Sequence, residues 1–212
     1  MRLFLSSYRV GNNPNKLVEL VGNNKRVAMI ANAQDYKSSV ERNEKVAAEL
    51  EDLNALGFEA FEVDLRQFFD SIITLNDLRD CGLVWVRGGN VFVLRLAMKL
   101  SGFDQLLHDC LENDKFVYGG FSAGGCVLSP SLKGFDIVDD ASLTKSSYGL
   151  MADYSGLGLL DYHFEPHYKS DHPESVDIDK EIAKLKKMGL PYKTLRDGEA
   201  ILINGKKEEL LK

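Results

Sequence analysis

The amino-acid sequence predicts an α/β fold in which a mostly parallel β-sheet lies between two layers of helices, with a small hairpin near the C-terminus. Short apolar runs alternate with segments of helical periodicity as far as Ser122, and such alternation is typical of βαβ units. The chain has 212 residues, of which 44% are hydrophobic and 27% charged, as in an ordinary globular protein. Because it contains no repeat and no linker rich in Pro, Gly or Ser, we expect one domain over residues 1–212.

The expected strands of the first half are short and bounded by polar residues. They cover residues 3–6, 27–31, 58–65, 82–86 and 115–119. Between them, Ser38 begins a helix with the spacing of a capping box, and Gly57 ends that helix. A strongly apolar helix follows from Phe92 to Gly102, and residues 103–111 then keep the spacing of an amphipathic helix.

The last third of the chain is less regular. We expect a strand over residues 159–165 and a late helix that ends at Gly189. Residues 192–195 and 200–204 flank a turn that contains an Asp-Gly pair, which predicts that these two runs form a hairpin.

Charge and cysteine usage exclude several classes of function. The net charge of -6 argues against nucleic acid or an anionic membrane as the main partner. Three cysteines without paired spacing fit neither a disulfide framework nor a zinc site. No apolar run is long enough for a signal peptide or a membrane helix, so we expect a cytoplasmic protein.

Ser122 is the candidate nucleophile. Residues 120–124 fit the pattern G-x-S-x-G directly after an expected strand, and a helix can begin at Ala123. A strand, a sharp turn and a helix form the setting that a nucleophile elbow requires. The small residues Gly120 and Gly124 leave room for the strained turn, and the Ala123 N–H favours negative charge beside the hydroxyl.

A second oxyanion donor is expected at the end of a neighbouring strand. Gly88, Gly89 and Asn90 follow residues 82–86, and ligands of parallel sheets bind at the carboxyl ends of strands. Glycine lets the backbone approach a substrate closely, so the Gly89 N–H is the candidate donor. Asn90 can also act as a helix N-cap.

The general base is expected among the histidines. His167 follows an expected strand in the constrained segment 164–168, where a base is readily presented, and is favoured over His163, which lies inside that strand. The acid that orients the imidazole is left open. Asp197 in the predicted turn, Asp153 and Glu165 are the candidates, and Glu165 is only two residues from His167.

Three segments of the chain resemble peptidase family S51, whose best-known member is an α-aspartyl dipeptidase. Residues 86–92 are similar to the G-G-N-T-F segment of the family, residues 118–124 to its nucleophile elbow, and residues 164–168 to its N-P-H-F/Y segment. The order and separation of the three segments also agree, and the resemblance covers nearly the whole chain.

The resemblance implies a flavodoxin-like or class I glutamine amidotransferase-like fold and no metal or organic cofactor. It implies that Ser122 is the nucleophile, that His167 is the base, and that the N–H groups of Gly89 and Ala123 form the oxyanion hole. The acid of the family lies in an L-x-E-G turn that matches residues 195–198 with Asp197 in place of Glu. An alternative family assignment points to Asp153.

The resemblance also implies a substrate. It indicates a cytoplasmic serine exopeptidase that hydrolyses the N-terminal bond of short peptides, Asp-X dipeptides among them. Aspartate-specific members hold the acidic side chain with an arginine after the histidine, but residues 169–180 contain none. Lys169, Lys180 or Arg87 are the candidates for that contact, and Gly88 and Asn90 are further substrate-binding candidates.

Other functions fit the same residues. A cyanophycinase-like or amidotransferase-like hydrolase shares the fold, although amidotransferases carry cysteine at the elbow and Cys126 lies one helical turn beyond Ser122. A non-catalytic binding module is the third hypothesis.

The expected partner is a short peptide, and the chain is expected to be a monomer or a homodimer.

Overall fold

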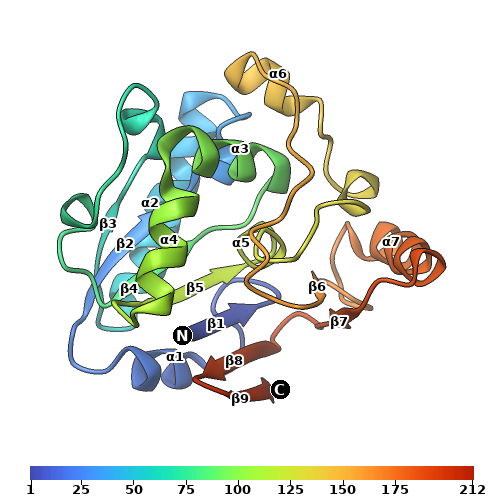
Figure 1. Cartoon of the computed structure of the whole chain (residues 1–212). Coiled ribbons are helices and arrows are strands. Elements are labelled where there is room, and N and C mark those ends of the chain that lie inside the picture. The colour runs from blue at the N-terminus through green and yellow to red at the C-terminus, as the bar shows by residue number, and fades with distance from the viewer.

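A central sheet organises the computed structural model, which describes residues 1–212. Its seven strands run in the order β3-β2-β4-β5-β1-β8-β9 (Figure 1). They are β1 Arg2–Ser6, β2 Arg26–Ile30, β3 Glu59–Glu62, β4 Leu83–Val86, β5 Val117–Phe121, β8 Ala200–Asn204 and β9 Lys207–Leu211. The first five are parallel to one another, whereas β8 and β9 are antiparallel to their neighbours. The predicted α/β fold with a mostly parallel sheet is confirmed.

Helices cover both faces of the sheet (Figure 1). They are α1 Pro14–Val21, α2 Ser39–Ala55, α3 Val91–Ser101, α4 Phe103–Glu112, α5 Ala123–Cys126, α6 Leu143–Tyr148 and α7 Ser175–Met188. Short 3-10 turns add Asn32–Gln34, Leu65–Phe68, Leu75–Leu78 and Phe135–Ile137. No helix combines the length and the apolar character that a passage through a lipid bilayer demands.

The strands alternate between two apolar cores, as period-two side-chain direction requires. Leu3 and Leu5 of β1 face a large core shared with α3, α4 and α5, whereas Phe4 faces a smaller core shared with α1 and α2. The parallel strands are buried on both faces, which explains why they are apolar throughout in the sequence.

The helix ends agree with the sequence signals. Ser38 caps α2 with a capping box that Glu41 completes, and Gly102 and Gly189 end α3 and α7 in the left-handed region. Asn90 is the N-cap of α3, where its side chain accepts from two backbone N–H groups at 3.0 and 3.1 Å.

One predicted strand pairing was wrong. A C-terminal hairpin is present, but β8 forms it with β9. Residues Tyr192–Thr194 (β7) instead pair in parallel with β6 (His163–Glu165), in a separate two-stranded sheet. The turn that contains Asp197 therefore connects the small sheet to the central one.

Candidate active site

Four neighbouring strands of the central sheet deliver residues to one place. Ser122 directly follows β5, and Ser7 directly follows β1. Gly88 and Gly89 follow β4, and Gln34 follows β2. Because these strands are parallel and adjacent, their carboxyl ends lie at one edge of the sheet, where ligands of such folds bind.

Ser122 sits on a strained turn between β5 and α5. Its φ of 50° and ψ of -121° are unfavourable for any residue with a side chain. The surrounding glycines make the turn possible, because a Cβ at Gly124 would lie 2.2 Å from the Val86 carbonyl oxygen and a Cβ at Gly120 2.9 Å from it. This backbone is that of a nucleophile elbow, with the hydroxyl beyond the end of the strand.

The peptide unit between Gly88 and Gly89 is held in one orientation. Its carbonyl oxygen accepts from Gln34 Nε2 at 2.6 Å and from Arg87 Nη1 at 3.0 Å. In a trans peptide the N–H points opposite to the C=O, so the Gly89 N–H is turned away from these donors. It makes no hydrogen bond within the protein and lines the same cavity as Ser122. Ala123, the other donor expected from the sequence, is the first residue of α5, and its N–H has no partner within that helix.

His167 makes hydrogen bonds to Asp197 and to Ser7, and these two partners are bonded to each other. Its Nδ1 lies 2.7 Å from Asp197 Oδ1, and its backbone N–H donates to Ser7 Oγ at 2.8 Å. The Ser7 hydroxyl in turn donates to the same Asp197 oxygen at 2.7 Å. Asp197 is fixed from the other side, because its N–H donates to Ser170 Oγ at 2.8 Å. An acceptor at Nδ1 leaves Nε2 of a neutral imidazole free to accept a proton.

Burial favours the neutral form of this imidazole. The residue is 1% exposed, and this desolvation lowers the pKa of His167 below its usual 6.5. A second histidine acts in the same direction, because the His172 ring is stacked on His167 with centroids 3.7 Å apart and planes 8° apart. Asp197 opposes both effects and raises the pKa of His167.

The nucleophile and the base are not hydrogen-bonded to each other in this structure. Ser122 Oγ has no hydrogen bond, and His167 Nε2 lies 3.9 Å from Glu174 Oε2. Bonds between nucleophile and base often tighten only with substrate.

A metal ion fits this histidine pair poorly. The ligand atoms of His167, His172 and Glu174 lie within 4.8 Å of one another. However, parallel stacked rings direct their nitrogen lone pairs side by side rather than toward a common point. The arrangement suits an imidazole base better than a metal centre.

The other candidate acids lie elsewhere. Asp153 is paired with Lys99 at 2.7 Å and with Arg95 at 3.9 Å, and these cations lower the pKa of its carboxyl. Glu165 is fully buried in β6 and neither of its oxygens has a hydrogen-bond partner. Among the three candidates, only Asp197 contacts the His167 ring.

A cavity of about 480 Å³ opens in front of Ser122. Its lining includes Gly88, Gly89, Ser122 and His167, together with the cations Lys37, Lys45 and Arg87. Arg87 Nε lies 3.3 Å from Glu49 Oε2, whereas Lys37 and Lys45 are in no ion pair. Lys169 is exposed, lies 5.0 Å from the Tyr168 ring centroid, and lines neither cavity next to Ser122.

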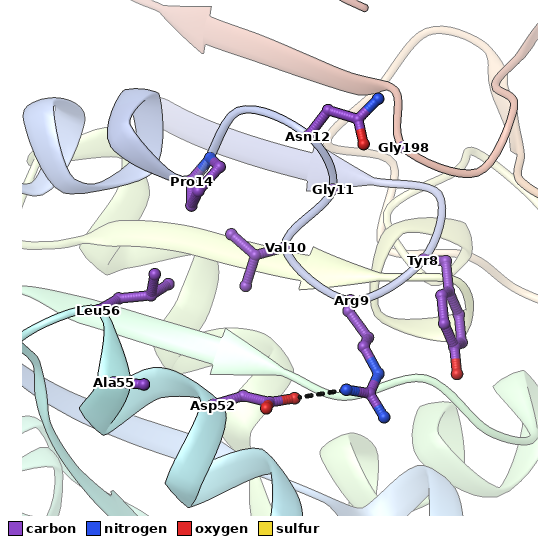
Figure 2. Close-up of a pocket in the computed structure, with 10 residues that line it drawn as sticks. All are labelled: Tyr8, Arg9, Val10, Gly11, Asn12, Pro14, Asp52, Ala55, Leu56 and Gly198. Atoms are coloured by element: carbon purple, nitrogen blue, oxygen red, sulfur yellow. Dashed lines mark hydrogen bonds and ion pairs between the residues drawn. The ribbon is translucent and has the colours of Figure 1, made fainter.

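Two further hollows adjoin this one. A cavity of about 470 Å³, drawn in Figure 2, shares Tyr8 with the Ser122 cavity, and the Arg9–Asp52 ion pair of 3.0 Å lies at its wall. A much smaller hollow, about 20 Å³, lies behind Ser122 and Ala123. Cys126 lines this small hollow, but its thiol is buried, donates toward the Phe164 carbonyl at 3.3 Å, and has a pKa raised by desolvation. A buried thiol of this kind is a poor nucleophile.

No pattern in the sequence indicated several residues of the site. Ser7, Gln34, His172 and Glu174 belong to no motif. Ser7 and Gln34 contact residues far away in the chain, whereas His172 and Glu174 lie next to the ring of His167, a few residues earlier. The feature that could have pointed to Ser7 and Gln34 is a polar residue shortly after a parallel strand, since Ser7 directly follows β1 and Gln34 ends the 3-10 turn after β2.

Comparisons with known proteins find peptidases similar to this chain. An uncharacterized peptidase of Listeria monocytogenes is 30% identical over 154 residues, which are 73% of this chain and 71% of that protein. An uncharacterized peptidase of Pasteurella multocida is 29% identical over 58% of this chain and 56% of its own. A crystal structure provisionally described as peptidase E, from Listeria monocytogenes EGD-e, has a TM-score of 0.76 and 27% identity over 100% of this chain and 98% of its own.

A more distant structure shares the fold alone. It is a peptidase from an acI-B1 actinobacterium, with a TM-score of 0.66, 15% identity and coverage of 99% of this chain and 86% of its own. The sequence profile of peptidase family S51 matches residues 6–211. With nearly the whole chain matched, this protein is a peptidase that belongs to family S51.

Proposed function

We propose that this peptidase removes the first residue of short peptides through an acyl-enzyme on Ser122. One observation carries the proposal: His167, with its Nδ1 2.7 Å from Asp197, lines the same cavity as the strained Ser122 and the free Gly89 N–H. A nucleophile, a base with its orienting acid, and oxyanion donors are the groups that acyl transfer needs.

In the first step, Ser122 Oγ attacks the carbonyl carbon that follows the first residue of the substrate. His167 Nε2 takes the hydroxyl proton, and Asp197 stabilises the imidazolium that forms. The carbonyl oxygen becomes an oxyanion, which the N–H groups of Gly89 and Ala123 can bind. The tetrahedral intermediate then breaks its C–N bond, and His167 returns the proton to the leaving amine.

In the second step, water hydrolyses the ester on Ser122. His167 again accepts a proton, this time from water, and returns it to Ser122 Oγ as the ester bond breaks. The first amino acid leaves with its new carboxylate, and the free enzyme is restored.

The charges of the large cavity support a substrate with a carboxylate near the scissile bond. Lys37 and Lys45 line it without an ion pair of their own. Asp-X dipeptides carry one carboxylate on the first side chain and another at the C-terminus, so they are candidate substrates. Lys37 and Lys45, rather than Lys169, are the side chains that can meet either group.

Hydrolysis of an X-Leu dipeptide panel, with Asp, Glu, Ala, Leu and Lys as the first residue, tests the proposal. We expect cleavage of at least one dipeptide, and a loss of at least 1,000-fold in kcat with Ser122→Ala, on the order of the cost of losing a catalytic serine. Circular dichroism of the Ser122→Ala protein controls for folding. Full activity of that variant would contradict the role of Ser122 as nucleophile. An inert panel would favour the cyanophycinase-like hydrolase or the binding module over a dipeptidase.

A further inference from the structure

The small hollow behind the nucleophile is lined by acids without cations. Asp139, Glu174 and Glu181 contribute carboxyl groups to it, next to Ser122 and Gly89. No lysine, arginine or histidine lines it. Lys184 does not line the hollow and is paired with Asp136 at 3.0 Å, whereas Glu174 Oε2 lies 3.9 Å from His167 Nε2 and from His172 Nδ1.

Glu181 shows that the acidic lining lacks a partner. The residue is 0% exposed, and neither of its carboxyl oxygens has a hydrogen-bond partner within the protein. A buried polar group without a partner costs free energy and calls for an explanation. Asp139 is bound on one side only, since Oδ2 accepts from the Val91 N–H at 2.7 Å.

The size of the hollow limits what can enter it. Its volume of about 20 Å³ exceeds the roughly 10–15 Å³ that one water molecule needs, but it is far too small for a lysine or arginine side chain. A single ammonium group is close to water in size and carries the charge that the carboxyl groups lack.

Position then identifies the ammonium group. In a peptide the α-nitrogen of the first residue lies about 2.5 Å from the carbonyl carbon of the same residue. If Ser122 attacks that carbon, the α-ammonium group must lie beside Ser122. We propose that Asp139, Glu174 and Glu181 bind the α-ammonium group of the substrate in this hollow, which rests on the peptidase function proposed above for Ser122.

The two cavities that meet at Ser122 and Gly89 then have opposite charges. The small one offers carboxyl groups to the N-terminus of the peptide, and the large one offers Lys37 and Lys45 to its carboxylates. A zwitterionic dipeptide is complementary to this pair of cavities. Cleavage is thereby restricted to the first peptide bond, because an internal bond has no ammonium group beside it.

The raised pKa values of two of these carboxyl groups are those expected where no cation lies beside them. Burial raises the pKa of Asp139 to about 7 and that of Glu181 to about 8. An ammonium group among them favours the ionised forms, as opposite charges do.

The first test compares three substrates of the wild-type protein. They are the dipeptide that the panel shows to be cleaved fastest, its N-acetyl derivative, and p-nitrophenyl acetate, which reports acylation of Ser122 without an ammonium group. We expect kcat/KM for the N-acetyl dipeptide to be at least about 100-fold lower than for the free dipeptide. Equal cleavage of the two would overturn the inference.

The second test uses isosteric variants. Asp139→Asn keeps an oxygen for the Val91 N–H, and Glu181→Gln keeps the volume. We expect each to lower kcat/KM for the free dipeptide by about 10- to 100-fold, mainly through KM, with p-nitrophenyl acetate hydrolysis changed less than twofold. Asp136→Asn, an exposed neighbour outside the hollow, is the matched control and should leave all rates unchanged.

The outcomes separate the two proposals. Unchanged dipeptide kinetics in both Asp139→Asn and Glu181→Gln would refute ammonium binding while the Ser122 peptidase stands. Failure of Ser122 to react with both p-nitrophenyl acetate and a fluorophosphonate would refute the peptidase mechanism, and the ammonium site with it.

Discussion

Replacement of Asp197 by asparagine removes the negative charge from the His167 pair and leaves its shape. Asp197 Oδ1 lies 2.7 Å from His167 Nδ1, and at an effective dielectric constant of about 20 the attraction between carboxylate and imidazolium is about 6 kcal/mol. The acid side chain is 24% exposed, so water screens part of this attraction. We therefore expect kcat/KM to fall by about 1,000- to 10,000-fold, which corresponds to about 4–5.5 kcal/mol.

Steady-state hydrolysis of the best dipeptide measures this loss, with circular dichroism and a melting curve to verify the fold. Asp153→Asn is the matched control, because Asp153 is the alternative acid of the sequence and is held by Lys99 and Arg95 away from the histidine. We expect that control to keep at least half of the wild-type activity. The reasoning is refuted if Asp197→Asn keeps more than a tenth of the activity, or if Asp153→Asn loses as much.

Three further substitutions test the surroundings of the site. Gln34→Met removes the 2.6 Å hydrogen bond to the Gly88 carbonyl, and we expect kcat to fall about tenfold with KM little changed. This loss is smaller than the cost of removing a whole oxyanion donor, because Arg87 still binds that carbonyl. An unchanged kcat would contradict the role of Gln34. His172→Phe keeps a ring against His167 but removes a charge that lowers the pKa of His167. The acidic limb of the pH profile of kcat/KM should therefore move to higher pH. A shift to lower pH would contradict this reasoning. Glu181→Gln should raise the melting temperature at pH 8.5 and do so much less at pH 5, as differential scanning calorimetry can show. The folded pKa of Glu181 is raised to about 8 from 4.5, so ionisation destabilises the fold as pH rises through this window, by at most about 5 kcal/mol, and an equal effect at both pH values would contradict the reasoning.

The local signals of the sequence predicted much of the fold and the centre of the site. Apolar runs located the parallel strands, and G-x-S-x-G after a strand predicted the elbow at Ser122, whose φ of 50° the structure shows. These features depend on a few neighbouring residues, such as Gly120 and Gly124, which have no room for a Cβ. Such short-range constraints leave their mark on the residue types themselves.

Long-range pairing could not be predicted in the same way. The strand at residues 192–194 has few apolar side chains, and nothing in its pattern distinguishes β6 from β8 as its partner. Ser7 touches Asp197 across 190 residues of chain, and Gln34 orients a peptide 54 residues away. A serine or glutamine after a strand is compatible with many roles, and only the three-dimensional arrangement selects one of them.

The site is divided between two sheets, and this division affects how the enzyme loses activity. Ser122 belongs to the central sheet, whereas His167 and Asp197 follow the strands of the short β6–β7 sheet. The small sheet docks on α5 through Phe164, which packs so closely on Gly125 that a Cβ there would lie 2.6 Å from the ring. A three-residue ladder of this kind can open locally at a lower free energy than the whole domain. On gradual heating, the base and its acid would then separate from the nucleophile while the central sheet is still intact, so that inactivation precedes global unfolding.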